Sequence, residues 1–220
     1  MARPPATTPK AILEAAIRVA SRDGLQATTL DKVAEEAGVT KGGVLYHFAS
    51  KDDLLRRMME HFANEVEQGL VTRIADDPHA DRRWVRAMID MVFAPQADLE
   101  HRADVTPHGI APDLTHKFIM AMLTAFASNP QLLEVIRPFL ERMRARIQSE
   151  ENAVEQVVTW LAADGLFLWE LFGMARPGDA MWNAVVEELR RRSRPRPPAQ
   201  FGAAATTQPP SADPTLGAEG

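Results

Sequence analysis

Residues 28–51, TTLDKVAEEAGVTKGGVLYHFASK, carry the pattern that decides the fold of this chain. Apolar side chains recur at helical spacing over residues 30–37, and Gly38 follows at the point where a helix usually ends in a left-handed residue. Residues 40–47 then predict a second short helix, with polar and aromatic side chains where a core helix would be apolar. Two short helices around a glycine turn indicate a helix-turn-helix with a recognition helix for DNA.

Hydroxyl side chains stand where both helices begin. Thr28 or Thr29 can cap the first helix, and with Thr28 as the cap Asp31 falls at the third helical position, where its charge suits the helix N-terminus. Thr40 can cap the second helix, whose free backbone N–H groups then face outward. Such a helix end is suited to a phosphate group.

Charge is distributed unevenly along the chain. Residues 37–51 contain no acidic side chain, while Lys41, His47 and Lys51 supply donors. Residues 1–60 hold nine Lys and Arg against eight Asp and Glu, and the remaining residues hold sixteen against twenty-two, which makes the net charge −5. The basic surface is therefore small, which argues against a sequence-blind polyanion binder.

The run from Ala11 to about Phe62, which includes ILEAAIRVASRDGLQATTLDKVAEEAGVTKGGVLYHFASKDDLL, resembles the N-terminal DNA-binding domain of the TetR family of transcriptional regulators. The pattern is kept in register at Gly24, Thr29, Ala34, Gly38, Val39, Tyr46, Phe48, Lys51 and Leu54. The resemblance covers about a quarter of the chain. It implies an all-helical homodimer, usually a repressor, that a small-molecule ligand releases from double-stranded operator DNA.

The same resemblance implies roles for residues of the predicted recognition surface. Phosphates would be held by Thr29, Thr40, Lys41, Tyr46, His47 and Lys51, and base edges would face Lys41, Gly42 and Gly43. Alternatively, Tyr46 and Phe48 are partly core and His47 caps a buried corner. Gly43 and Val44 stand where family members often carry a larger residue, so shape and backbone contacts should carry more of the specificity.

Composition narrows the possible classes of protein. The apolar content of 45% fits a globular chain of 220 residues, and the absence of cysteine removes disulfides, thiolate metal sites and cysteine nucleophiles and fits a reducing cytoplasm. No run of about 18 apolar residues predicts a membrane span. No nucleophile elbow, zinc-protease motif or phosphate loop is present, so we expect neither an enzyme nor a cofactor. The spacing of His101, His108 and His116 matches no compact metal site.

Helical periodicity continues after the first 56 residues and predicts an all-α chain. We expect a disordered arm at 1–9, a three-helix helix-turn-helix domain at 10–56, a larger helical ligand-binding and dimerisation domain at 57–192, and a disordered tail at 193–220. Gly24 should end the first helix, and Ser50 should cap a long linking helix. Further helices are expected over residues 84–93, 114–126, 132–147, 154–172 and 178–192.

The last two predicted helices differ from the others in their apolar surface. Residues 154–172 are apolar nearly all round, and residues 178–192 offer a matching stripe that includes Val185 and Leu189. We expect them to pair two subunits, with an intramolecular core helix as the alternative. The arginines at 190, 191, 192, 194 and 196 are interpreted as a solvated helix end, with DNA backbone contact as the alternative.

A ligand pocket in the larger domain would be lined by apolar and aromatic groups with a few polar ones. The candidates are Trp84, Met88, Phe93, Met122, Phe126, Trp160, Asp164 and Phe167, with Met120 also eligible. The segment LAADGLFLWELFG resembles family members that bind bulky aromatic cations. Asp164 lies among apolar neighbours and needs a partner, which could be a cationic ligand, an arginine or water.

Taken together, these patterns predict a ligand-responsive DNA-binding regulator. We expect a repressor released from a palindromic operator by a small hydrophobic effector, with a cation as one option. A transcriptional activator and a helical interaction module that does not bind DNA are the alternatives. The acid-free segment at 37–51 argues against the second of these.

Overall fold

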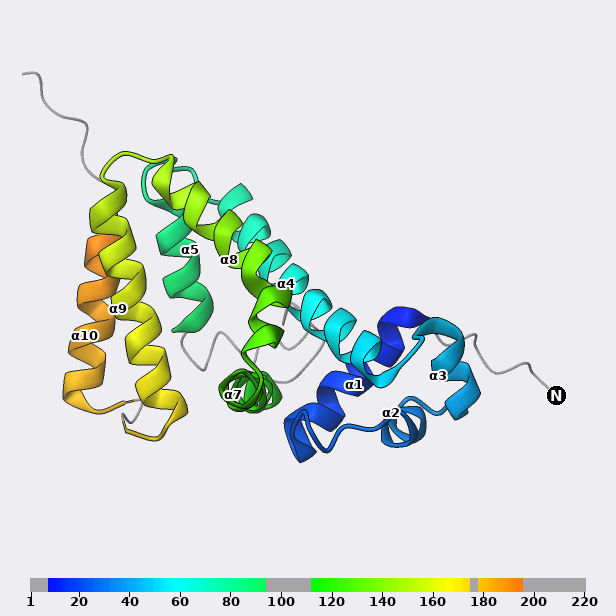
Figure 1. The fold of residues 1–220 in the computed structure, drawn as a ribbon. Coiled ribbons are helices and arrows are strands. Elements are labelled where there is room, and N and C mark those ends of the chain that lie inside the picture. The colour runs from blue at the N-terminus through cyan, green and yellow to red at the C-terminus, as the bar shows by residue number, and fades with distance from the viewer. Residues whose placement is uncertain (1–7, 94–111, 175–177, 196–220) are drawn as a thin grey trace, which may run out of the picture.

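The computed structural model describes residues 8–93, 112–174 and 178–195. Every regular element in these segments is a helix, which confirms the predicted all-α class for the described part of the chain (Figure 1). The helices are α1 (Pro9–Asp23), α2 (Leu30–Glu36), α3 (Lys41–His47), α4 (Lys51–Ala75), α5 (Arg83–Val92), α7 (Pro112–Ser128), the short 3₁₀ helix η1 (Pro130–Leu132), α8 (Leu133–Gln148), α9 (Ala153–Leu171) and α10 (Ala180–Ser193).

Some predictions fall outside these segments. Most of the expected arm at 1–9 and of the expected tail at 193–220 is not described, and neither are His101 and His108. The absence of a metal site therefore stays a prediction. None of the described helices combines the length and the hydropathy needed to cross a membrane.

The first three helices begin and end close to the predicted residues. Gly24 follows α1 with φ +86°, and Gly38 follows α2 with φ +66°, a region that favours glycine, so both predicted stops are confirmed. Thr40 caps α3, because its Oγ1 accepts a hydrogen bond from the Gly43 N–H at 3.1 Å.

The cap of α2 is Thr29, so the first of the two threonine options is wrong. Thr29 Oγ1 accepts from the Lys32 N–H at 3.3 Å. Thr28 is fully buried, and its hydroxyl donates to the Gly24 carbonyl at 2.9 Å. Thr28 thus stabilises the corner that follows α1, and Asp31 lies at the second helical position instead of the third.

Helix α4 is 25 residues long and links the two ends of the molecule (Figure 1). Ser50 caps it as predicted, since Ser50 Oγ accepts from the Asp53 N–H at 3.1 Å. Asp53 in turn accepts from the Ala49 N–H at 3.1 Å, so two free donors at this helix start are satisfied. The proposed domain boundary between residues 56 and 57 falls inside this helix.

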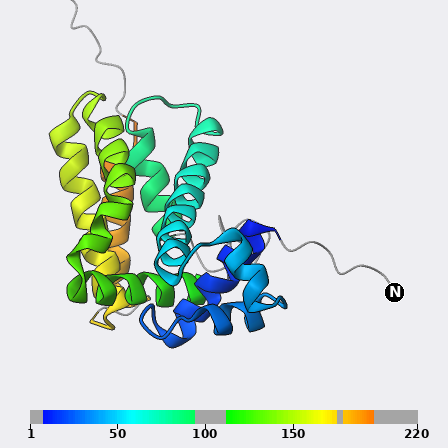
Figure 2. The same ribbon diagram turned by 45° about the vertical axis from the view of Figure 1, so that its right-hand side comes forward.

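Helix α7 packs across the end of the molecule that α1, α2 and α3 form (Figure 2). Its inner face enters the same hydrophobic core as α1, α2, α3 and the first half of α4. Phe118 of α7 is fully buried there, with its ring centroid 4.8 Å from that of Phe62 on α4. The first three helices therefore share one core with part of the larger domain.

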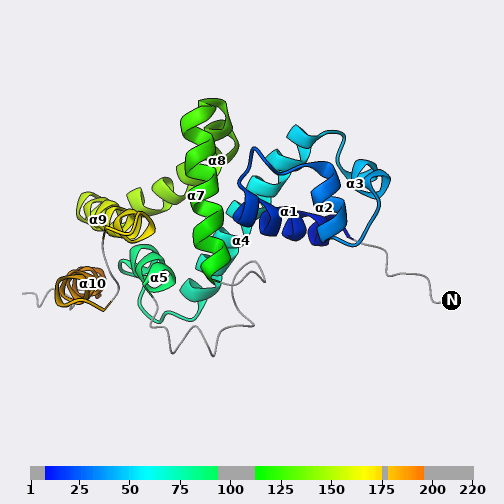
Figure 3. The same cartoon turned by 90° about the horizontal axis from the view of Figure 1, so that it is seen from below.

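Helices α5, α9 and α10 lie side by side at the other end (Figures 1 and 3). A second core joins them, and its buried members are Val85, Ile89, Phe93, Ile147, Ala163, Trp182, Val186 and Leu189. Leu189, predicted as an interface position, is only 3% exposed and belongs to this intramolecular core. Val185 packs against the same cluster and is partly buried. The inner face of α10 therefore packs within the protomer.

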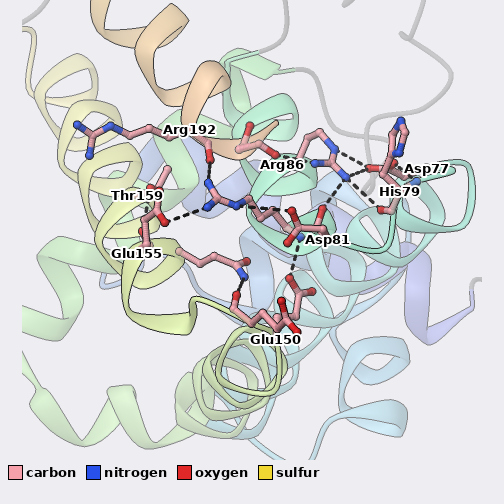
Figure 4. Close-up of polar contacts among 12 residues, drawn as sticks. Asp77, His79, Asp81, Arg86, Glu150, Glu155, Thr159 and Arg192 are labelled. Atoms are coloured by element: carbon pink, nitrogen blue, oxygen red, sulfur yellow. Dashed lines mark hydrogen bonds and ion pairs between the residues drawn. The ribbon is translucent and has the colours of Figure 1, made fainter. Parts of the chain in front are cut away.

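Two arginines at the start of α5 hold the end of α10, in what we call the arginine hub (Figure 4). Arg82 donates to the Arg192 carbonyl and, at 2.9 Å, to Glu155 on α9. Arg86 donates to the Ser193 carbonyl at 2.6 Å and to Asp77 at 2.7 Å. The last carbonyls of a helix lack intrahelical partners, so two guanidinium groups here satisfy them and oppose the negative end of the helix dipole.

The arginines of α10 itself are paired within the chain. Arg190 donates to the Phe93 carbonyl at 2.7 Å, while Arg191 and Arg192 bind Glu188 at 2.6 and 2.8 Å. Helix α10 also lies at the opposite end of the molecule from α3 (Figures 1 and 3). These contacts favour a solvated helix end over contact with DNA.

Candidate DNA interface and effector region

Helix α3 has one buried face and one solvent-exposed face. Val44 is fully buried, and Phe48, which follows the helix, is 1% exposed. The opposite face exposes Lys41, Gly42 and Tyr46, the last at 84%. The alternative that Tyr46 is partly core is therefore wrong, whereas Phe48 is core. A helix anchored by one face and open on the other can enter a groove of DNA.

The amines around α3 have exposed partners within the chain. Lys41 Nζ lies 3.0 Å from Asp31 Oδ2 at the start of α2, and both side chains are more than half exposed. Lys51 Nζ, at the start of α4, donates to the Gln26 carbonyl at 2.7 Å. An exposed ion pair such as Lys41–Asp31 contributes little to stability, and the hydrogen bond from Lys51 to a backbone carbonyl is also exposed to solvent. Both amines can therefore exchange these partners for phosphates at small cost.

The aromatic rings of the two remaining polar candidates on α3 contact each other. The rings of Tyr46 and His47 meet edge to face, with centroids 4.9 Å apart, and His47 lies 6.3 Å from the ring of Phe48. His47 is half-buried, while Tyr46 projects beyond it. His47 therefore lies between the exposed ring of Tyr46 and the buried ring of Phe48.

The eight predicted DNA-binding residues thus lie along α3 or at the starts of α2 and α4. Thr29 and Thr40 are exposed N-caps, Gly43 and Lys51 are half-buried, and the positions of the other four are given above. One exposed residue of α3, Leu45, is missing from the predicted set. Its signal in the sequence was its place four residues after Lys41 and directly after the apolar Val44.

The predicted effector residues divide between the two cores. Trp84, Met88, Phe93, Trp160 and Phe167 belong to, or pack against, the core of α5, α9 and α10. Met122 and Phe126 are buried in the core shared with α1 and α4. Met122 and Phe126 are separated from the other residues because the face of α7 that carries them packs against α1. The eight predicted residues therefore do not line the wall of a single pocket.

Part of the aromatic surface is already engaged by the chain. The Arg146 guanidinium lies 4.4 Å from the centroid of Trp84, and Arg146 also pairs with Glu67 at 2.7 Å. The Phe93 ring packs edge-on against Trp182, with centroids 5.7 Å apart. A cation that stacked on Trp84 would have to displace Arg146.

Asp164 interacts with Trp160 on the same helix. Burial raises the pKa of this carboxyl to about 6, and a hydrogen bond from Trp160, one turn earlier on α9, partly offsets that rise. The side chain therefore remains a weakly compensated carboxylate on an aromatic helix face.

A second acidic group lies further along the same helix. Burial raises the pKa of Glu170, and the neighbouring His116 of α7 opposes that rise. The His116 ring lies 5.5 Å from the Phe167 ring, so α7 and α9 meet here through an imidazole and a phenyl group. Glu170 and His116 were not among the predicted effector residues.

The outer face of α9 exposes a continuous apolar stripe. Its members, at helical spacing, are Val154, Val158, Leu161, Trp169 and Phe172, and each is more than half exposed. Met181 at the start of α10 is 73% exposed. Large apolar patches on a folded chain usually mark an interaction surface.

Two family models match the chain. One, described as "Tetracyclin repressor-like, C-terminal domain", matches residues 82–194, which is half of the sequence. The other, described as "Bacterial regulatory proteins, tetR family", matches residues 12–58. The HTH-type transcriptional regulator SrpR of Pseudomonas putida is 34% identical over 93 residues, which are 41% of this chain and 42% of that protein. The chain therefore matches less than half the length of that relative.

Solved structures share the fold at low sequence identity. The multidrug binding protein EbrR, in complex with imidazole, has a TM-score of 0.55 and 22% identity, over 87% of this chain and 97% of that one. A transcriptional regulator from Saccharomonospora viridis, in complex with choline, has a TM-score of 0.57 and 19% identity, over 83% and 93% of the two chains. At such identities the likeness concerns the fold alone.

Proposed function

This chain belongs to the TetR family of bacterial regulatory proteins, and from that premise we propose that it is a repressor that binds a palindromic operator as a dimer and leaves it when a small effector binds. As a member of the family it is a DNA-binding transcriptional regulator and not an enzyme. Its site of action would be the cytoplasm, where bacterial operators are found.

The observation that best supports the choice of DNA surface is the state of the α3 donors. Lys41 and Lys51 rest on exposed partners, Tyr46 projects into solvent, and no acidic residue lies between positions 37 and 51. Each amine that binds a phosphate releases counterions, so binding should weaken steeply with salt.

Selection of duplexes from a random pool, followed by footprinting, tests the DNA part of the proposal. We expect a pseudo-palindrome with half-sites about one helical turn or somewhat more apart. Protection of a single asymmetric half-site, or affinity that does not change with salt concentration, would contradict it.

The exposed stripe of α9 supports a dimer formed through α9 and α10. Leu161→Glu places a carboxylate at the centre of this stripe, on a residue that is 61% exposed in the protomer. We expect sedimentation to report a folded monomer, because an unpaired charge at a buried interface is costly. Leu189 is unsuited to this test because it belongs to the intramolecular core. An intact Leu161→Glu dimer would contradict the assignment.

The weakly compensated carboxylates of α9 support an effector that is small, hydrophobic and cationic. Asp164 and Glu170 lie with Trp160, Phe167 and His116 at or near the packing of α9 against α5 and α7. Proteins of the same fold bound to choline and to imidazole make organic cations the first compounds to test.

The test compares a lipophilic cation with its neutral isostere by tryptophan fluorescence, in the free protein and in the operator complex. The cation should bind more tightly and weaken operator binding. Because protons compete for Asp164, whose pKa is about 6, the preference for the cation should grow as the pH rises through that value. Asp164→Asn should narrow the preference. Equal affinity for both compounds would mean that the effector belongs to another class.

A further inference from the structure

The exposed face of α3 carries one large apolar side chain that neither the core nor the polar donors explain. Leu45 is 42% exposed on the helix expected to meet DNA, while its neighbour Val44 is fully buried. Scattered exposed leucines are ordinary on protein surfaces. Leu45, however, lies next to the eight residues of the candidate interface, and its position there indicates which part of the DNA it would contact.

The glycines beside Leu45 are not required by the fold of the protomer. Both lie inside α3, and a methyl group would lie 3.7 Å from Thr40 Oγ1 at Gly42 and 3.5 Å from it at Gly43, which is ordinary van der Waals contact. Glycine inside a helix is less stable than alanine by about 1 kcal/mol. The missing methyl groups therefore favour a close approach by something outside the protomer.

The general lean of helical side chains indicates that Leu45 covers this exposed surface of α3. Long helical side chains lean toward the helix N-terminus and cover the preceding turn. For Leu45 that turn contains Lys41 and Gly42, and Lys41 is its neighbour four residues earlier. An apolar group thus lies next to an amine, on a helix whose backbone is uncovered.

In the major groove, the apolar feature that distinguishes one base from the others is the 5-methyl group of thymine. The amine of Lys41 can bind guanine O6 or N7, and a leucine beside it can contact a methyl group. We propose that Leu45 is a specificity-determining residue that selects thymine, through its 5-methyl group, at one position of each half-site. This inference rests on the DNA-binding function proposed above and adds direct base readout to the readout of DNA shape.

Uracil substitution tests the inference on the full-length protein and its selected operator. Uracil keeps the base pairing of thymine and removes only the methyl group. We expect one thymine per half-site at which uracil weakens binding by about fourfold, the effect of exposing one buried methyl group. Leu45→Ala should bind the thymine and uracil operators equally. Its thermal unfolding should stay close to that of the wild type, because Leu45 is 42% exposed and belongs to none of the hydrophobic cores.

Lys41→Ala is the matched control. It should weaken binding and relax preference at a guanine, yet keep the thymine-to-uracil ratio at the Leu45 position. The inference is overturned if no thymine shows a methyl effect, if the operator has no thymine in the contacted half-site, or if Leu45→Ala keeps the wild-type ratio. A failure to select any duplex would instead contradict the proposed DNA-binding function, and with it this inference.

Discussion

The α3 surface and the arginine hub lie toward opposite ends of α4, and both carry cationic side chains (Figures 1 and 4). In the hub, Arg82 is 4% exposed, and its guanidinium donates to a helix carbonyl and a carboxylate. At α3, Lys41 and Lys51 are held by exposed partners. The partners of basic residues, more than their number, therefore distinguish a candidate DNA-binding surface from a structural contact between helices.

The hub also differs in its backbone. Arg82 has φ +57°, a left-handed conformation that is unfavourable for a residue with a Cβ. Its backbone N–H donates to the Glu150 carboxylate at 3.0 Å, and its side chain binds groups on α9 and α10. These contacts offset the strain, which costs on the order of 1 kcal/mol or more. The α3 surface shows no such backbone strain. This fits a region whose lysines can exchange their partners within the chain for phosphates.

The largest effect should follow from removing the central arginine of the hub. Arg82→Met removes the guanidinium that binds Glu155 and the Arg192 carbonyl, and the free energy of unfolding should fall by about 3 kcal/mol. Urea unfolding measures this loss. The adjacent exposed Arg83→Met is the matched control and should unfold like the wild type. A stable Arg82→Met variant would mean that the hub does not hold these helices together.

A smaller effect is expected midway along α4, where Glu67 is buried and binds Arg142 and Arg146, each at 2.7 Å. The hydrogen bond from Arg142 is the main cause that lowers the pKa of Glu67. Because the folded-state pKa lies below the unfolded one, the stabilisation is present above the ordinary glutamate pKa and is lost as the pH falls through the lowered value.

Glu67→Gln should therefore reduce stability by about 2 kcal/mol at neutral pH and by less in acid. Chemical unfolding at several pH values measures the difference. Glu60→Gln, which alters an exposed pair with Arg56 on the same helix, is the control and should leave the pH dependence unchanged. A difference that stayed constant down to acid pH would show that the ion pairs do not stabilise the fold.

The smallest change in stability should come from filling the bare surface of α3, and it should have the opposite sign. Gly42→Ala removes an unfavourable helix residue without a clash, so stability should rise by up to about 1 kcal/mol. Operator affinity should fall, because the added methyl group holds the helix away from the groove. Calorimetry and anisotropy titration together test this. A variant that gained stability and kept full affinity would show that the glycines do not serve close approach.

The two regions also differ in how far they could be predicted. The helix-turn-helix follows from local signals, such as the glycines after α1 and α2 and the caps Thr40 and Ser50. The sequence left Thr28 and Thr29 both open as caps of α2, because the burial of Thr28 depends on the corner after α1. The hub joins Arg82 to a carbonyl 110 residues away, a contact that no local pattern encodes.

The packing of the proposed effector residues could be predicted only in part, for the same reason. Asp164 was identified as a carboxylate that needs a partner, but the partner is Trp160. Met122 and Phe126 have the composition of pocket residues, yet the packing of α7 against α1 buries them in the other core. Periodicity predicts that a helix face is apolar, but it does not specify which neighbouring helix covers that face.

The most direct test of the contrast between the two regions is the salt dependence of operator binding in two matched variants. Lys51→Ala removes an amine beside α3, and Arg191→Ala removes an exposed arginine of α10 that is paired with Glu188. In anisotropy titrations at several salt concentrations, we expect Lys51→Ala to weaken binding evenly across operators and to lower the log–log slope by about one unit. Arg191→Ala should leave the slope unchanged. A slope that fell for Arg191→Ala and not for Lys51→Ala would contradict this account, because it would place the DNA-binding surface at α10 instead of α3.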